Sequence, residues 1–404
     1  MSTSPSLNVS RDTVRFGKYR LVDRIAVGGM AEIFLAQQTE GEGLERPVVI
    51  KRIRPHLSKH TTFVKMFLNE ARLAAQLNHP NIVQIHDLGK IGESYFIAME
   101  YIFGRDMRRV MPKAEQLGIP FPLVYALRIA SDVCAGLHYA HKKVDLYGNP
   151  LNIVHRDVTP ENVFVSFDGT VKLLDFGIAK AANQVEQTRS GELKGKLSYM
   201  SPEQCFGKPL DCRSDIFSVG VVLYEWLTGF KLFTGESEVA VMRSITDGKI
   251  YAPSYFKADI PEPVEEILMK ALEKDRERRY QTAGEMRAAI DAFLSTYDFT
   301  PSPQHLSNFL RQLFHDELNE EQGRLKQTTS SDQVLALEDE VTPMSSNPVR
   351  EGPPSREGRS ASERLISLTL PGEQIEALEA IARRTGVSVN KMVGELLAAW
   401  LKYR

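Results

Sequence analysis

The 404-residue sequence has few cysteines, almost no net charge and no long apolar run, and each shortage excludes a class of protein. Its three cysteines, Cys134, Cys205 and Cys212, lack the paired spacing of metal ligands and leave an odd thiol, which is typical of a reducing compartment. The formal charge of −2 at pH 7 argues against a protein that coats nucleic acid or membrane along its whole length. No run approaches the roughly 18 apolar residues of a membrane helix, and residues 1–10 contain no apolar signal core. We therefore expect a cytoplasmic protein with no membrane partner.

The sequence does contain the balance of a soluble globular protein, with 42% hydrophobic and 25% charged residues. Its length allows two or three domains and a large core.

Two motifs stand in the middle of the chain: residues 153–165 read IVHRDVTPENVFV, and residues 173–177 read LLDFG. An acid, an amide five residues later and a second acid after another apolar strand suit a site for metal-bound phosphates. Phosphoryl transfer asks a protein for metal ligands, a cation and an acceptor for the nucleophile's proton. Both motifs, in this order and spacing, resemble the catalytic core of protein kinases.

The resemblance implies an α+β fold with two lobes, a small β-rich one and a large helical one. It assigns ATP as the phosphate donor and Mg2+ as the metal. Asp157 would orient the substrate hydroxyl, and Asn162 and Asp175 would hold the metal through oxygen atoms, which Mg2+ prefers.

A glycine-rich hairpin is expected over the ATP phosphates, with Ile25, Ala26, Gly28 and Gly29 in it. If Gly28 is the middle glycine of the family's motif, Ala26 and Ala31 stand where the first and third would be. A simple strand turn is the alternative for this stretch taken alone.

Lys51 ends the strand-like sequence PVVIK and resembles the lysine that contacts the α and β phosphates. Glu70 lies in the expected helix over residues 62–77 and would pair with Lys51. The alternative places Glu70 on a solvated helix face.

The adenine pocket is expected at the connection between the lobes. By resemblance, Met99 lines its back, and the backbone of Glu100 and Ile102 bonds the base. Three apolar residues would sandwich the ring, although each could also be plain core: Ile33, Val49 and Phe164.

Two residues depart from the pattern of serine/threonine kinases. Thr159 stands where the family has a lysine that touches the transferred phosphate, and Lys196 stands where it has a threonine. Because those positions face each other in the family, we infer a swap in which Lys196 supplies the charge and Thr159 the hydroxyl. The alternative is a degraded, inactive site.

The activation segment offers Thr188 and Ser190 as phosphorylation sites in a polar stretch, with Arg156 as the residue that would hold the phosphate. Glu203, in the sequence SPE, should be buried against Arg279.

The domain organisation follows from these features and from composition. We expect a disordered N-terminus, a protein kinase domain, an accessory amphipathic helix, a disordered linker rich in Ser, Pro and Gly, and a folded tail. Their ranges are 1–18, 19–299, 300–325, 326–360 and 361–404. Residues 144–151 should form a surface hairpin.

The tail alternates like a strand over residues 364–370 and then shows two helical patterns. A single strand has no sheet partner, so a second chain is needed. The pattern resembles the ribbon-helix-helix family, in which paired strands enter the DNA major groove. The resemblance would place Leu365, Ser367 and Thr369 toward the bases and Ser388 on the backbone.

The net positive charge of this tail is small for a DNA-binding segment, because its six basic and five acidic residues sum to +1. A homodimer is therefore the firmer expectation, with DNA as a possible partner.

The sequence as a whole predicts a protein kinase that transfers the γ-phosphate of ATP to Ser and Thr hydroxyls of protein substrates, including its own activation segment. The competing hypothesis is a catalytically weak or inactive kinase-like module that acts as a DNA-binding or scaffold regulator.

Overall fold

The computed structural model describes residues 13–40, 44–176, 193–297, 299–319 and 334–336. The chain divides into two compact units, residues 1–339 and 340–404, and every described residue belongs to the first.

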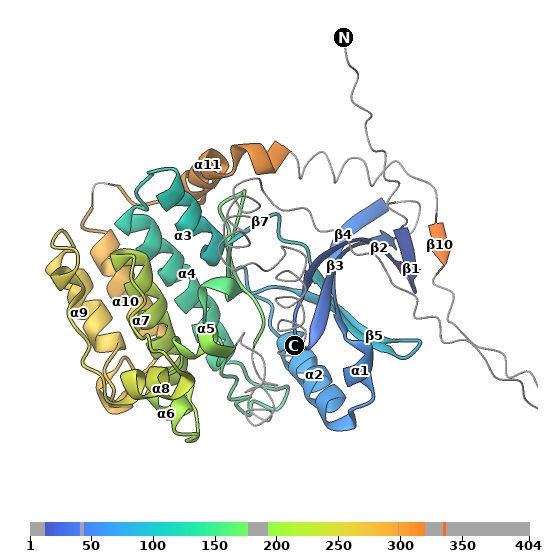
Figure 1. Cartoon of the computed structure of the whole chain (residues 1–404), viewed down its shortest axis with the longest axis horizontal. Helices are drawn as coiled ribbons and strands as arrows, with labels where there is room; N and C mark the ends of the chain where they lie inside the picture. The colour runs from blue at the N-terminus through green and yellow to red at the C-terminus, as the bar shows by residue number, and fades with distance from the viewer. Residues whose placement is uncertain (1–12, 41–43, 177–192, 298, 320–333, 337–404) are drawn as a thin grey trace, which may run out of the picture. The chain divides into compact units, whose positions relative to one another are not determined.

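The amino-terminal part of this unit is built around one sheet in the order β10-β1-β2-β3-β4-β6-β5. Figure 1 shows these strands gathered on one side, with helix α2 packed along them. The strands and the two helices of this lobe are β1 (Thr13–Phe16), β2 (Tyr19–Val27), β3 (Ala31–Glu40), β4 (Leu44–Ile53), α1 (Pro55–Ser58), α2 (Thr61–Ala74), β5 (Ile85–Ile91), β6 (Ser94–Glu100) and β10 (Val334–Ala336).

The sheet begins before Tyr19, where we expected the folded domain to start. Phe16 of β1 is buried and packs edge-on against Phe96 of β6, so burial of an aromatic ring fixes this strand. At the other end of the chain, β10 pairs with β1 in parallel, within the stretch expected to be a linker. The small lobe therefore includes backbone on both sides of the expected kinase boundaries.

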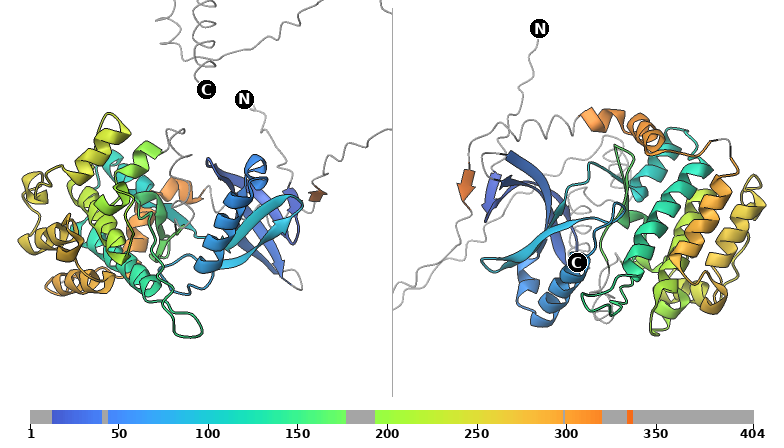
Figure 2. Two further views of the ribbon diagram at one scale, coloured as in Figure 1. Left: turned by 90° about the horizontal axis from the view of Figure 1, so that it is seen from below. Right: turned by 180° about the vertical axis from the view of Figure 1, so that it is seen from behind.

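The carboxyl-terminal part of the unit is helical and contains a small sheet of order β7-β8-β9. Figure 2 shows the same division from below and from behind. Its elements are β7 (Gly104–Asp106), α3 (Met107–Gln116), α4 (Leu123–His141), η1 (Pro160–Asn162), β8 (Val163–Ser166), β9 (Val171–Leu173), α5 (Leu193–Leu197), α6 (Pro202–Cys205), α7 (Cys212–Thr228), α8 (Glu238–Thr246), η4 (Pro253–Tyr255), α9 (Glu262–Ala271), η5 (Arg276–Arg278), α10 (Ala283–Leu294) and α11 (Pro303–Leu313).

Helix α7 forms the centre of the large lobe, because it is apolar on nearly all sides and buried almost throughout. Asp211 caps its start by accepting a hydrogen bond from the backbone N–H of Arg213, and Gly229 ends it in the left-handed conformation (φ 79°). Of the described helices, none has the length and apolar character needed to cross a membrane.

Glu203 is buried against Arg279, as the sequence predicts. The guanidinium donates two parallel hydrogen bonds to the carboxylate, at 2.7 and 2.9 Å, and Ser214 donates a third at 2.7 Å. Burial alone would raise the pKa of Glu203, but the bonds from Arg279 outweigh it and hold this pKa below its ordinary value. The pair ties the end of the activation segment to the helical lobe.

Helix α11 lies along the large lobe beside α3 (Figure 1). Its apolar face and the residues after it are buried there: Leu306, Phe309, Leu310, Leu313, Phe314 and Leu318. The hydroxyl of Ser307 donates to the carbonyl of Phe167 at 2.7 Å, and Lys113 pairs with Glu317 at 2.7 Å. The helix is therefore part of the large lobe's core.

Residues 144–151 form the expected turn, closed by a bridge between Val144 and Pro150, with Gly148 at a φ of 85°. Its tip exposes Leu146 and Tyr147 almost completely.

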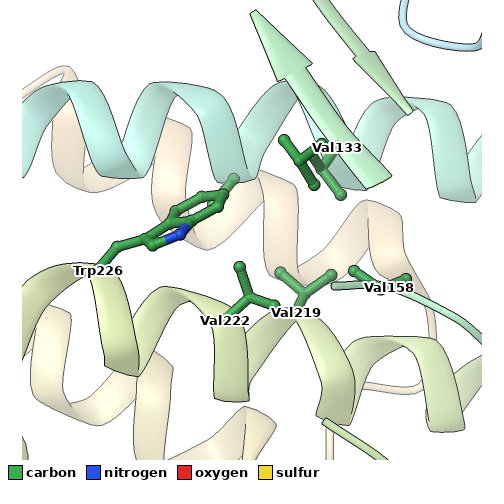
Figure 3. A pocket seen from close by; sticks show the side chains of 7 residues that line it. Val133, Val158, Val219, Val222 and Trp226 are labelled. Atoms are coloured by element: carbon green, nitrogen blue, oxygen red, sulfur yellow. The ribbon is translucent and has the colours of Figure 1, made fainter. Parts of the chain in front are cut away.

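A small apolar void lies beside the segment that carries Val158 (Figure 3). Its walls come from α4, α7 and the segment around β8: Ala130, Val133, Val158, Val163, Val219, Val222 and Trp226. It has no room for a water molecule, and the indole N–H of Trp226 has no hydrogen-bond partner among the described residues. The void is a packing defect rather than a ligand site.

Candidate active site

An ion pair joins the two lobes. The Nζ atom of Lys51, on β4, lies 2.8 Å from Oδ1 of Asp175, two residues after β9. Burial alone would lower the pKa of Lys51, but the carboxylates of Asp175 and Glu70 outweigh it and raise this pKa. Lys51 is therefore a fixed cation at this point.

Glu70 lies on α2, half-buried in the wall of the cavity that Lys51 and Asp175 also line. Its charge contributes to the raised pKa of Lys51, so the two side chains are electrostatic neighbours. A direct ion pair between Lys51 and Glu70 stays a prediction. Placement in this wall favours the paired role of Glu70 over a solvated helix face.

Asp157 and Asn162 are held together in the loop before β8. The amide Nδ2 of Asn162 donates to both the carbonyl and the Oδ2 atom of Asp157, at 2.8 Å each. Both side chains are buried. Because the amide nitrogen is engaged by Asp157, the Oδ1 atom of Asn162 is the end that can face a cation.

A buried network under this loop fixes its backbone. Asp215 of α7 accepts from the backbone N–H of His155 and of Arg156, both at 2.8 Å, and lies 2.7 Å from Nε2 of His141. Burial alone would raise the pKa of Asp215, but its hydrogen bonds, led by His141, lower it and keep the carboxylate ionised. We did not single out Asp215 from the sequence, although an acid within an apolar helix was the available signal.

His155 connects the two motifs. Its Nε2 donates to the carbonyl of Leu174 at 2.8 Å, and its Nδ1 accepts from the backbone N–H of Asp157 at 3.2 Å. Burial lowers the pKa of His155, against the opposing pull of Asp215, which fits a neutral ring with one donor and one acceptor.

Two residues of this region, Arg156 and Asp175, have left-handed backbone conformations that residues other than glycine rarely adopt. Arg156 has a φ of 67° and Asp175 a φ of 46°. Strained residues of this kind concentrate at functional sites, where surrounding contacts hold them. The contacts from Asp215 and Lys51 serve that purpose here.

Three of the residues expected around adenine, Ile33, Val49 and Met99, lie on one face of the large sheet. Ile33 lies opposite Lys51, and Met99 opposite Val49, in antiparallel register, so all four side chains share a face. Met99 is buried and lines the cavity that holds Lys51 and Asp175. Phe164 is half-buried on β8. Glu100 is the last residue of β6, and Ile102 lies two residues after it.

The turn between β2 and β3 carries the expected glycine-rich loop. Ile25 and Ala26, near the end of β2, and Gly29, in the turn, are exposed. The N–H of Gly28 donates to the carbonyl of Ala31 at 2.9 Å. A side chain at residue 28 would meet that carbonyl at ordinary contact distance, so the turn itself does not demand glycine.

Lys196 contacts the short segment that also carries Thr159. Lys196, on α5, has its Nζ 3.4 Å from Oε2 of Glu161, and Arg108 contacts the other oxygen of Glu161 at 2.7 Å. The hydroxyl of Thr159 is buried and has no hydrogen-bond partner among the described residues. Glu161 and Arg108 were not singled out from the sequence.

The donor set fits a magnesium ion and a nucleotide. A carboxylate at Asp175 and an amide oxygen at Asn162 are the hard donors that Mg2+ takes, and Lys51 adds a cation for phosphate beside them. Several expected residues lie outside the described part of the chain: Gly177, Thr188, Ser190, Leu365, Ser367, Thr369 and Ser388.

Comparison with known proteins agrees with this geometry. The family model described as the protein kinase domain matches residues 19–289. The chain belongs to this family.

Curated relatives with similar sequences are named as kinases. The chain is 45% identical over 310 residues to the tyrosine-protein kinase MasK of Myxococcus xanthus, covering 77% of this chain and 48% of MasK. It is 37% identical to the serine/threonine-protein kinase PknB of Mycobacterium leprae over 72% of this chain and 44% of PknB. It is 35% identical to the serine/threonine-protein kinase PrkC of Bacillus subtilis over 68% of this chain. The chain thus spans about half the length of these relatives or less.

A solved structure gives the same fold. The kinase domain of PknI from Mycobacterium tuberculosis superposes with a TM-score of 0.52 at 25% identity, covering 69% of this chain and 97% of that domain.

Proposed function

We propose that this chain transfers the γ-phosphate of ATP to serine and threonine hydroxyls of proteins. The observation that carries the proposal is the joining of Lys51 to Asp175 beside a loop in which Asn162 fixes Asp157. A fixed cation, two metal donors and a buried carboxylate on one site are the parts that phosphoryl transfer requires.

Each residue has a defined task in this reaction. Lys51 binds the α and β phosphates, and Asn162 and Asp175 hold Mg2+, which neutralises charge on the phosphate oxygens. Asp157 accepts the hydrogen bond of the acceptor hydroxyl and turns it toward the γ-phosphorus. The bond from Asn162 keeps the Asp157 carboxylate oriented before the acceptor arrives.

Lys196 takes the place of the missing lysine at residue 159. Its contact with Glu161, two residues from Thr159, supports a position within reach of the transferred phosphate. Glu161 pairs with Lys196 at 3.4 Å and with Arg108 at 2.7 Å. Because the distance to Lys196 is longer, the attraction between Glu161 and Lys196 is the weaker of the two. The buried hydroxyl of Thr159 then supplies the hydrogen-bonding group.

Transfer to tyrosine is the second candidate, and one observation favours it: the relative with 45% identity is named a tyrosine-protein kinase. A panel of peptides that differ only in a Ser, Thr or Tyr acceptor decides between the two. The proposal expects phosphate on the Ser and Thr peptides and little on the Tyr peptide, and the reverse order would contradict serine/threonine specificity.

The chain's own activation segment is a further substrate. Thr188 and Ser190 are its candidate acceptors, and Arg156 is the cation that would hold the resulting phosphate. The Nε atom of Arg156 is buried and has no hydrogen-bond partner among the described residues, which supports that role. Mass spectrometry of protein incubated with Mg2+ and ATP locates the modified residues.

Residues 361–404 form a dimerising segment in this proposal, and DNA is its possible ligand. The support is the sequence pattern alone, a lone strand and two amphipathic helices that need a second chain. Dimerisation brings two catalytic domains together and so favours phosphorylation between partners.

A further inference from the structure

We infer that Lys172 is a positioning residue that sets the adenine selectivity of the nucleotide site through an ion pair with Glu100. This inference rests on the proposed function, because it concerns the ATP site of the same kinase. The Nζ atom of Lys172 lies 2.7 Å from Oε1 of Glu100, and neither side chain is more than about a quarter exposed (16% and 22%).

The ion pair crosses between the two lobes. Lys172 is the middle residue of β9, in the small sheet of the large lobe, whereas Glu100 is the last residue of β6, in the sheet of the small lobe. The backbone that follows Glu100 is the connection between the lobes. A contact at this point therefore fixes the connection relative to both sheets.

The Oε1 atom of Glu100 has a second donor besides Lys172. This atom also accepts a hydrogen bond from the backbone N–H of Gln84 at 2.7 Å. The backbone N–H of Glu100 in turn donates to the carbonyl of Gln84 at 2.9 Å. The side chain and the main chain of Glu100 are thus fixed together. A shift of the carboxylate should therefore also move the Glu100 backbone, which would bond adenine.

The Lys172 end is equally fixed. Asn81 donates through Nδ2 to the carbonyl of Val171 at 2.9 Å and accepts from the backbone N–H of Leu173 at 2.9 Å. These bonds hold β9 on both sides of Lys172. The ammonium group is consequently aimed from a rigid strand and not from a free loop.

Lys172 is also the cross-strand neighbour of Phe164. The two residues are directly opposite each other in the β8–β9 pair, so their side chains share one face of the small sheet. Phe164 is the expected floor of the adenine site. Lys172 thus lies beside Phe164 and pairs with Glu100, the residue at the start of the connection between the lobes. In this way Lys172 sets the distance between Phe164 and Glu100.

Adenine and guanine differ at the edge that would face Glu100. Adenine presents a donor amine where guanine presents an acceptor oxygen. The backbone carbonyl of Glu100, held in place, would accept a hydrogen bond from the adenine amine and would repel the guanine oxygen. If Lys172 keeps that carbonyl in place, its loss should weaken ATP binding much more than GTP binding.

The test is the ratio of ATP affinity to GTP affinity, measured by calorimetry on the full-length chain with Mg2+. Lys172→Met should lower this ratio roughly tenfold, the effect of about one hydrogen bond to a charged group. Glu100→Gln, which keeps the acceptor for Gln84, should lower it in the same direction. Lys172→Arg, which keeps the charge, should restore most of it.

Lys90→Met is the matched control, because it removes an exposed ion pair with Glu93 in the same small lobe and should leave the ratio unchanged. If the wild type prefers ATP and both Lys172→Met and Glu100→Gln keep that preference, the inference is wrong while the proposed function stands. If the wild type binds neither nucleotide, the proposed function fails and this inference with it.

Discussion

Lys51 and Asp175 are 124 residues apart in the chain, yet their charged atoms lie 2.8 Å apart, and this pair joins the small lobe to the large one. The raised pKa of Lys51 means that its charge persists throughout the ordinary pH range.

Lys51→Met should reduce kcat/KM for ATP by roughly 100-fold or more. The substitution removes a preorganised cation that would stabilise the negative charge on the phosphate oxygens in the transition state. The side chain length is kept, so the fold should survive. Steady-state kinetics at several ATP concentrations measures the effect. The control is Lys65→Met, an exposed lysine on the same lobe's α2, which should retain wild-type rates. A Lys51→Met protein with unaltered kinetics would contradict the role of this cation.

Lys196→Ala should lower kcat much more than ATP affinity, because the contact with the phosphoryl group strengthens as transfer proceeds. The double variant Thr159→Lys with Lys196→Thr restores the family's usual arrangement and should recover part of the lost rate. Single-turnover kinetics separates the chemical step from nucleotide binding. If Lys196→Ala turns over at the wild-type rate, the swap hypothesis is wrong.

The buried pair of Glu203 and Arg279 predicts a pH dependence of stability. Because the folded-state pKa of Glu203 lies below its ordinary value of 4.5, the contribution is fully present above that pH and is lost as the pH falls through the lower folded value. Glu203→Gln should cost about 3 to 5 kcal/mol of unfolding free energy at pH 7, since Arg279 loses its buried partner.

Thermal unfolding between pH 7 and pH 3 measures this difference, which should shrink at the acid end. Glu277→Gln is the control, because Glu277 is exposed and its bond to Arg213 contributes about 1 kcal/mol or less. A gap between Glu203→Gln and wild type that stays constant with pH would count against the linkage.

Removal of residues 361–404 should make the chain monomeric and leave the kinase domain folded. Leu368→Asp should have the same effect in the full chain, because it would place a charge in the expected apolar underside of the ribbon. Sedimentation at micromolar concentration measures the state of each protein. A full-length chain that is already monomeric would remove the basis for the dimer and for phosphorylation between partners.

The meeting of Lys51 with Asp175, and of Asp157 with Asn162, was accessible from the sequence because each residue belongs to a short motif with fixed spacing. Their catalytic and metal-binding roles stay predictions. Their placement follows from strands and turns that the local sequence specifies. The same holds for Glu203 and Arg279, which both belong to recognisable family patterns.

Contacts between distant segments could not be predicted in this way. Asp215 supports the catalytic loop from 59 and 60 residues away, and Lys172 reaches Glu100 across 72 residues. The sequence shows only an acid in an apolar helix and a lysine in a short strand. Strand β1 was missed for a related reason, because its four residues are stabilised by Phe96 from β6 and not by a local pattern.

The central claim is phosphoryl transfer by this site, and incorporation of labelled phosphate from ATP into a protein acceptor tests it most directly. The wild type with Mg2+ should label the acceptor. Asp157→Asn keeps the size of the side chain and removes its charge, so it should bind ATP with little change and lose labelling by roughly 100-fold or more. A wild type that binds ATP without transferring phosphate, or equal labelling by Asp157→Asn, would contradict the account.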